Sequence, residues 1–207
     1  TVLYVAGEPS SMMGEAAGVA LAEDLSDGGR EQAGGVTDRA RGARLRQDGQ
    51  RVAVRADAQN RYHTAQSRDA RNIDYSALLD EAVSGRSLVR AIAYVIRADS
   101  PEEERFFEAL VDIGFDTRIK RIKTFGDGSK KADWDVGMSL DAVTLADNVD
   151  AVVLCTGDGD FSRLCSHLRH EGVRTEVLSF GSATADELVA AADSFLDLSE
   201  HEDVFLL

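Results

Sequence analysis

From Arg51 onward, short apolar segments alternate along the chain with segments whose apolar residues recur at helical spacing. The segment 151–155, Ala-Val-Val-Leu-Cys, is apolar at every position. A strand that is apolar on both faces is typical of the centre of a parallel sheet with helices on both sides. Strands that alternate with helices indicate βαβ units. The pattern therefore predicts an α/β fold, with a mostly parallel central sheet between two layers of helices.

The alternation also predicts the bounds of the elements. The clearest helix start is Ser100-Pro101-Glu102-Glu103, because Ser caps the helix, Pro takes its first position and Glu103 completes a capping box. Asp74 is the expected cap of an earlier helix. The expected strands are 51–57, 87–97, 115–125, 150–155, 173–180 and 195–198, and the later helices are 134–146, the segment ending at Glu171, and 183–192.

The first 50 residues differ from the rest, since they hold 9 of the 18 glycines. One helix is expected at Met12–Leu25, and the remainder reads as a flexible extension. This extension is a candidate site for self-association or for a protein partner. Residues 51–198 are expected to form the folded domain, and 199–207 an acidic tail. Arginines gather near the boundary, where they form either a solvated tail or an arm that contacts phosphates; they are Arg39, Arg41, Arg44, Arg46, Arg51 and Arg55.

Composition excludes several classes of protein. The 207 residues carry 23 Lys and Arg against 37 Asp and Glu, a formal charge of −14, which excludes a globally basic nucleic-acid-binding surface but not a local basic patch. No apolar run is long enough to predict a transmembrane helix. Two cysteines are too few for a disulfide framework or a zinc site, so a reducing cytoplasm is expected. Abundant Asp with scarce Lys also suits a surface in concentrated salt.

Acidic residues follow the ends of two expected strands. Asp57 ends the first strand, and Asp158 and Asp160 follow the strand that ends at Cys155. Asp135 lies in the first turn of the helix after a Lys-containing loop. In parallel α/β sheets ligands bind outside the carboxyl ends of the strands. If the two strands are neighbours, the sequence predicts that these carboxylates meet at one edge of the sheet.

Carboxylates that share a pocket repel one another. At a separation of roughly 4 Å and an effective dielectric near 20, each pair costs about 4 kcal/mol. Either some of them are protonated or a cation lies among them. Oxygen ligands favour Mg²⁺ or Mn²⁺, which activate water and stabilise displacement at phosphorus. The alternative is that Asp158 and Asp160 only form a turn and a helix cap.

Other phosphate and metal motifs are absent from the sequence. The loop 126–131 lacks the spacing of a P-loop, the first expected strand is not followed by a dinucleotide-binding glycine turn, and the EF-hand spacing is missing. The four histidines form no convincing catalytic set, although His63 lies close to Asp57 in the sequence. These absences leave the aspartates as the principal candidate site.

The ordered set of segments 51–64, 130–136, 156–161 and 177–181, with Asp141-Ala142 between them, resembles the NYN-domain nucleases, the LabA-like branch of the PIN-like superfamily. The resemblance covers roughly residues 51–198. It implies a PIN-like three-layer α/β/α sandwich and a metal-dependent ribonuclease site. The acids that match the family pattern are Asp57, Asp135, Asp158 and Asp160, with Asn60 and Ser162 beside them as polar site residues. Asp141 is a second-tier candidate, and otherwise a solvated acid.

The sequence thus predicts a cytoplasmic endoribonuclease that uses Mg²⁺ or Mn²⁺, with RNA as its partner. Lys130 and Lys131 would hold substrate phosphates if the topology places them opposite the acids; otherwise they belong to a solvated loop. Two other classes stay open. One is a PIN-like module that binds RNA or a protein with little catalysis. The other is a metal-dependent phosphatase for small molecules.

Two positions depart from the family pattern. Arg55 precedes Asp57 and Arg61 follows Asn60, where apolar residues are usual. A buried arginine without a partner is costly. Either Arg55 pairs with a carboxylate of the site, which would weaken metal binding, or the first strand is less buried than expected.

Overall fold

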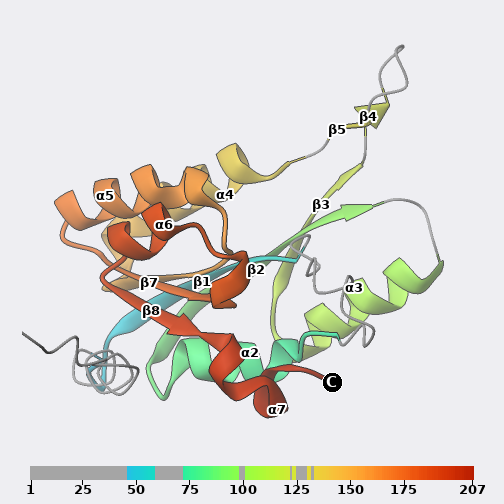
Figure 1. The fold of residues 1–207 in the computed structure, drawn as a ribbon, viewed down its shortest axis with the longest axis horizontal. Coiled ribbons are helices and arrows are strands. Elements are labelled where there is room, and N and C mark those ends of the chain that lie inside the picture. Colours follow the sequence, from blue (N-terminus) through green and yellow to red (C-terminus); the bar gives the residue numbers. More distant parts are fainter. Residues whose placement is uncertain (1–45, 59–71, 98–100, 122, 125–129, 132) are drawn as a thin grey trace, which may run out of the picture. The chain divides into compact units, whose positions relative to one another are not determined.

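The computed structural model describes residues 46–58, 72–97, 101–121, 123–124, 130–131 and 133–207 (Figure 1). The expected helix Met12–Leu25 lies outside the described residues, as does Asn60.

A six-stranded sheet forms the centre of the domain, and every neighbouring pair of its strands is parallel. The prediction of a mostly parallel sheet is therefore confirmed. The order across the sheet is β3-β2-β1-β6-β7-β8. The strands are β1 (Arg51–Asp57), β2 (Ser87–Arg97), β3 (Asp116–Arg121), β6 (Ala151–Cys155), β7 (Arg174–Ser179) and β8 (Ser194–Asp197).

The strand order reverses between β1 and β6. Chain connections run outward from β1 through β2 to β3, then return to β6 and run outward again through β7 to β8. The two central strands pair directly, with Val54 opposite Val153 and Ala56 opposite Cys155. Such a reversal opens a crevice at the carboxyl ends of the central strands, which is where ligands bind in sheets of this type. The condition that the strands of Asp57 and Asp158 be neighbours is thus met.

Helices cover both faces of the sheet (Figure 1). The face of α2 and α3 also receives the C-terminal α7, and the opposite face carries α4, α5 and α6. The expected cap Asp74 accepts hydrogen bonds from the amides of Ser76 and Ala77. Among the described helices, none is long and apolar enough to cross a membrane. The helices are α2 (Tyr75–Val83), α3 (Pro101–Ile113), α4 (Asp135–Leu145), α5 (Ser162–His170), α6 (Asp186–Ala191) and α7 (Glu202–Phe205).

Alternation along the strands divides the core in two. In β1, Val52 and Val54 pack under α2 and α3, whereas Ala53 faces the α4 side. All five residues of β6 are buried, as its uniformly apolar sequence predicts. Short 3-10 helices complete the connections; they are η2 (Ala146–Asn148), η3 (Gly159–Phe161), η4 (Gly181–Ala183) and η5 (Leu198–His201).

The structure departs from the expected bounds in two places. The expected strand 115–125 is divided into β3 and β4 (Lys123–Thr124), and β4 pairs antiparallel with β5 (Lys130–Lys131). Residues 199–207, expected as an acidic tail, form η5 and α7 and contribute Phe205 to the core. Phe205 stands among acidic residues, but its side chain is only 2% exposed because it closes the end of the α2 layer.

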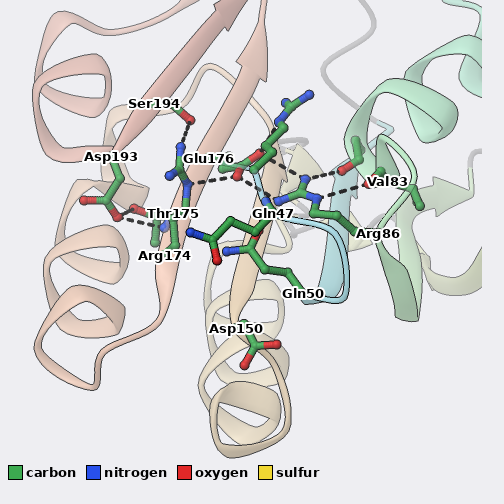
Figure 2. A network of polar contacts seen from close by, with 12 residues as sticks. Gln47, Gln50, Val83, Arg86, Asp150, Arg174, Thr175, Glu176, Asp193 and Ser194 are labelled. Carbon is green, nitrogen blue, oxygen red and sulfur yellow. Dashed lines mark hydrogen bonds and ion pairs between the residues drawn. The ribbon is translucent and has the colours of Figure 1, made fainter. Parts of the chain in front are cut away.

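A buried ionic cluster lies toward the amino ends of the strands (Figure 2). Glu176 of β7 is fully buried, and its two carboxylate oxygens accept hydrogen bonds from Nη1 and Nη2 of Arg86 at 2.9 and 3.1 Å. Arg46 Nε donates to the same carboxylate at 3.1 Å, and Arg174 Nε lies 2.9 Å from it. We call these four residues the Glu176 cluster. Its negative charge is fully matched by arginine.

The arginines near the domain boundary make contacts within the domain wherever the structure describes them. Arg46 contacts Glu81 and Glu176, and Arg51 pairs with Asp150. Arg55 lies inside the fold, only 1% exposed. The other arginines near the boundary, at positions 39, 41 and 44, lie outside the described residues.

Candidate functional site

Three of the predicted acids come together at the carboxyl edge of the sheet. One carboxylate oxygen from each of Asp135, Asp158 and Asp160 lies within 4.8 Å of the others. Asp158 and Asp160 are exposed, and Asp135 is partly buried. We call these three residues the aspartate cluster. It joins the first turn of α4 to the loop after β6, two segments that the sequence separates by more than 20 residues.

The loop after β6 holds Asp158 and Asp160 in a compact turn. Asp158 caps η3, because its Oδ1 accepts a hydrogen bond from the amide of Asp160 at 3.0 Å. The predicted capping role is thus present, and it coexists with the cluster because a carboxylate has a second oxygen. Gly157 allows the loop to pass close to η4: a Cβ there would lie 2.1 Å from the carbonyl oxygen of Ala183.

Asp135 is placed by the residue that precedes it. Trp134 is the N-cap residue of α4, and its Nε1 donates a hydrogen bond to the carbonyl oxygen of Val95 in β2 at 3.0 Å. A Cβ at Gly137 would lie 2.8 Å from the Trp134 ring, so the glycine makes room for the indole. These contacts fix the start of α4 against the sheet, and with it the position of Asp135.

The electrostatics of Asp135 reflect its surroundings. Burial is the main cause that raises its pKa, and the negative charges of Asp158, Asp133 and Asp160 add to the effect. A raised pKa means that the ionised carboxylate lacks sufficient compensation from the protein itself. A cation among the three side chains would provide that compensation.

The other predicted site residues occupy different places. Asp57 is the last residue of β1, partly buried, and lines a small cavity with Tyr75, Thr156 and Phe180. It is not a member of the aspartate cluster, although its strand neighbours β6. Ser162 is the first residue of α5 and directly follows η3. Lys130 and Lys131 form β5, and Asn60 lies outside the described residues.

Arg55 is part of a buried network beneath α4. The strand is fully buried there, so the expectation of a less buried first strand does not hold. The guanidinium donates hydrogen bonds to the carbonyl oxygens of Val54, Arg90 and Asp141. Burial lowers the pKa of Arg55, while the nearby Tyr94 and Asp141 raise it. Backbone carbonyl oxygens thus supply partners for both terminal nitrogens of the guanidinium, whereas its buried Nε has no hydrogen-bond partner among the described residues.

Asp141 belongs to this network and not to the aspartate cluster. Its Oδ2 accepts a hydrogen bond from the hydroxyl of Tyr94 at 2.9 Å and lies 3.6 Å from Arg118 Nε. Burial raises the pKa of Tyr94, so its hydroxyl stays protonated and continues to donate. Asp141, the second-tier candidate for the site, therefore holds α4 against the sheet.

The donor set suits a hard divalent cation. Three carboxylates provide only oxygen ligands, which Mg²⁺ and Mn²⁺ prefer. Opposite ligands of a Mg²⁺ ion are about 4 Å apart, close to the 4.8 Å that bounds the separations in the aspartate cluster. A small rotation of exposed side chains would bring the oxygens to coordination distance. The buried thiol of Cys155 offers no competing ligand, because burial raises its pKa to about 12.

Comparisons with known proteins identify the family and the fold of the chain. The sequence model of the family described as "NYN domain" matches residues 51–199. The low amplitude and bright protein LabA of Synechococcus elongatus is 30% identical over 161 residues, which cover 72% of this chain and 84% of LabA. A crystal structure of a protein of unknown function from Vibrio parahaemolyticus has a TM-score of 0.69 and 34% identity, covering 78% of this chain and 99% of that one.

Proposed function

Because the chain belongs to the NYN-domain family and has its PIN-like α/β fold, we propose that it is a metal-dependent endoribonuclease. The observation that carries the proposal is the aspartate cluster, which brings three carboxylates within 4.8 Å of one another at the carboxyl edge of the sheet. NYN proteins are members of a nuclease superfamily, and the cluster lies where sheets of this topology bind their ligands.

Asp135, Asp158 and Asp160 hold the cation in this proposal, and Asp57 completes the site from the end of β1. A bound Mg²⁺ or Mn²⁺ supplies an activated water molecule and neutralises charge that develops on the phosphate. The loop around Gly157 and the anchored start of α4 hold the carboxylates in place before the cation arrives. Such preorganisation reduces the cost of assembling the site when substrate binds.

The remaining predicted residues are assigned to the substrate. Lys130 and Lys131 of β5 hold RNA phosphates, Ser162 at the start of α5 provides a hydroxyl beside the cluster, and Asn60 provides a polar group after β1. This distribution puts the cation ligands on the sheet edge and α4, and the phosphate contacts on the segments around them.

The alternative is a PIN-like module that binds RNA or protein with little catalysis. Two sequence features favour it: the negative overall charge, and Arg55, since a neutralised Asp57 would bind metal poorly. The hydrogen bonds of Arg55 described above go to backbone carbonyl oxygens. These hydrogen bonds use none of the three carboxylates of the aspartate cluster.

A cleavage assay on mixed single-stranded and structured RNA tests the proposal. The protein is incubated in high and low KCl with Mn²⁺, Mg²⁺ or EDTA, beside the variant Asp158→Asn. Asparagine keeps the helix-capping oxygen but removes the charge. We expect metal-dependent cutting that falls at least about a hundredfold in Asp158→Asn, because several kcal/mol of transition-state stabilisation are lost.

The matched control is Asp112→Asn, an exposed acid of α3 on the other face of the sheet. It should cut RNA at the normal rate. Cutting that survives in Asp158→Asn would contradict the site. Absence of cutting by the folded protein under every condition would favour the binding module, and cutting of free nucleotides alone would favour the phosphatase.

A further inference from the structure

The lysines of this chain are confined to one short stretch. All four of them, at positions 120, 123, 130 and 131, fall within a dozen residues of a 207-residue protein whose formal charge is −14. The stretch begins in β3, which is an edge strand of the sheet, and continues into the β4–β5 pair beyond its end (Figure 1). The sequence thus concentrates its lysines in one stretch of an acidic protein.

Two cations of β3 point to the face that carries α4. Arg118 Nε lies 3.6 Å from Asp141 of α4, and Lys120 Nζ lies 4.9 Å from the centre of the Trp134 ring. Residues two apart in a strand share a face and are about 7 Å apart. Arg118 and Lys120 therefore form a short row of positive charge on the side of the sheet where α4 begins.

Lys120 is held by the two residues that directly precede Asp135. Its ammonium group donates a hydrogen bond to the carbonyl oxygen of Asp133 and lies over the ring of Trp134, the residue directly before Asp135. An ammonium group has three donors, so one bond to a carbonyl leaves capacity for an anion. The side chain is thus preorganised at the start of α4, the helix whose first turn carries Asp135.

Arg118 can leave its ion pair with Asp141 at little cost in stability. Its side chain is 44% exposed and that of Asp141 is 33% exposed. An ion pair at this exposure contributes little to stability. Asp141 also keeps its hydrogen bond from Tyr94 when Arg118 turns away. Arg118 can therefore exchange this partner for a phosphate without disrupting the network beneath α4.

We propose that Arg118 and Lys120 bind the phosphate backbone of an RNA strand that leads from the aspartate cluster along the edge of β3. The inference rests on the proposed function for the nature of its ligand, and it assigns the direction in which the RNA leaves the site. Positive groups on β3 hold flanking phosphates, while the negative cluster takes the scissile phosphate through its cation. The arrangement reconciles an acidic protein with a polyanionic substrate.

Salt-dependent RNA binding tests this assignment. Fluorescence anisotropy with a short labelled single-stranded RNA is measured in EDTA, so that cleavage does not contribute. For single strands, the slope of log affinity against log salt changes by about 0.7 for each phosphate contact. We expect the double variant Arg118→Gln/Lys120→Gln to lower the slope by about 1.4, with weaker binding at low salt. Lys120→Arg should retain the slope.

The matched control is Arg105→Gln, which removes an exposed positive charge from α3 on the opposite face. Its slope should stay that of the unaltered protein. An unchanged slope in the double variant, an equal loss in Arg105→Gln, or no RNA binding by the unaltered protein would overturn the assignment. Cleavage of RNA with Mn²⁺ reports separately on the proposed function. The protein can bind RNA through β3 without cleaving it, and it can cleave RNA without using the β3 contacts.

Discussion

Negative charge is compensated at one end of the central sheet and uncompensated by the protein at the other. In the Glu176 cluster, toward the amino ends of the strands, one buried carboxylate is matched by three arginines. In the aspartate cluster, beyond the carboxyl ends, three carboxylates approach one another, and acidic neighbours help to raise the pKa of Asp135. The first arrangement completes itself within the protein. In our proposal the second is completed by a cation from outside the protein.

Loss of the buried carboxylate should give the largest change in stability. Glu176→Gln leaves three arginines around a neutral side chain, and breaking a buried ion pair by removing one partner costs about 3–5 kcal/mol. Urea unfolding measures the change. Glu81→Gln removes the other, more exposed partner of Arg46, so it should cost less than about 1 kcal/mol. Equal losses in the two variants would refute the contrast between buried and exposed pairs.

The loop of the aspartate cluster should tolerate substitution unevenly. Gly157→Ala places a Cβ 2.1 Å from a backbone oxygen, and we expect a loss of about 1–3 kcal/mol in unfolding free energy. Gly159→Ala meets the flexible carboxylate of Glu187, which can rotate away, so its loss should be smaller. If Gly159→Ala were the more damaging change, the close approach of Gly157 to the backbone of η4 would not be what holds the cluster.

The two buried arginines, Arg86 and Arg55, should respond differently to removal of charge. Arg86→Met deprives Glu176 of its bidentate partner and should cost about 2 kcal/mol or more. Arg55→Met removes a guanidinium that binds carbonyl oxygens and whose Nε has no hydrogen-bond partner among the described residues. Its cost should stay below about 1.5 kcal/mol. Chemical denaturation of both variants measures the two losses of unfolding free energy. A larger loss for Arg55→Met than for Arg86→Met would contradict this prediction.

The pH dependence of the stability of the metal-free protein should show the unfavourable electrostatics of the aspartate cluster. The pKa of Asp135 is raised above its ordinary value of 3.8, so the folded state holds this proton more tightly than the unfolded state. The resulting stability is present at pH below 3.8 and is lost as pH rises through the raised pKa. Asp135→Asn should remove this loss. Thermal unfolding across that range checks it; the same pH profile in both proteins would contradict the assignment.

Sequence patterns predicted most of the fold, because the burial of a strand or helix directly determines its pattern of apolar residues. The apolar run of β6 can only be satisfied in the centre of a sheet, and the resemblance to the NYN family is confirmed by the comparisons. The meeting of Asp135 with Asp158 and Asp160 follows from the same topology. That Asp57 falls outside the group of carboxylates within 4.8 Å of one another could not be predicted, because side-chain orientation at a strand end depends on local packing.

The Glu176 cluster was missed, although a weak signal existed. Alternation in β7 places Glu176 on the same face as Leu178 and Phe180, both buried. A glutamate in that row indicates a buried charge, but its partners come from distant segments. Arg46 lies 130 residues away and Arg86 lies 90 residues away in the sequence. Their convergence is a property of the folded chain.

Manganese binding tests the central claim most directly. Free Mn²⁺ is counted by electron paramagnetic resonance as the protein is titrated, for the unaltered chain, Asp158→Asn and the control Asp112→Asn. The aspartate cluster predicts Mn²⁺ binding that weakens at least about tenfold in Asp158→Asn and is unchanged in Asp112→Asn. Equal affinity in all three proteins would show that the carboxylates at this edge of the sheet do not form a cation site.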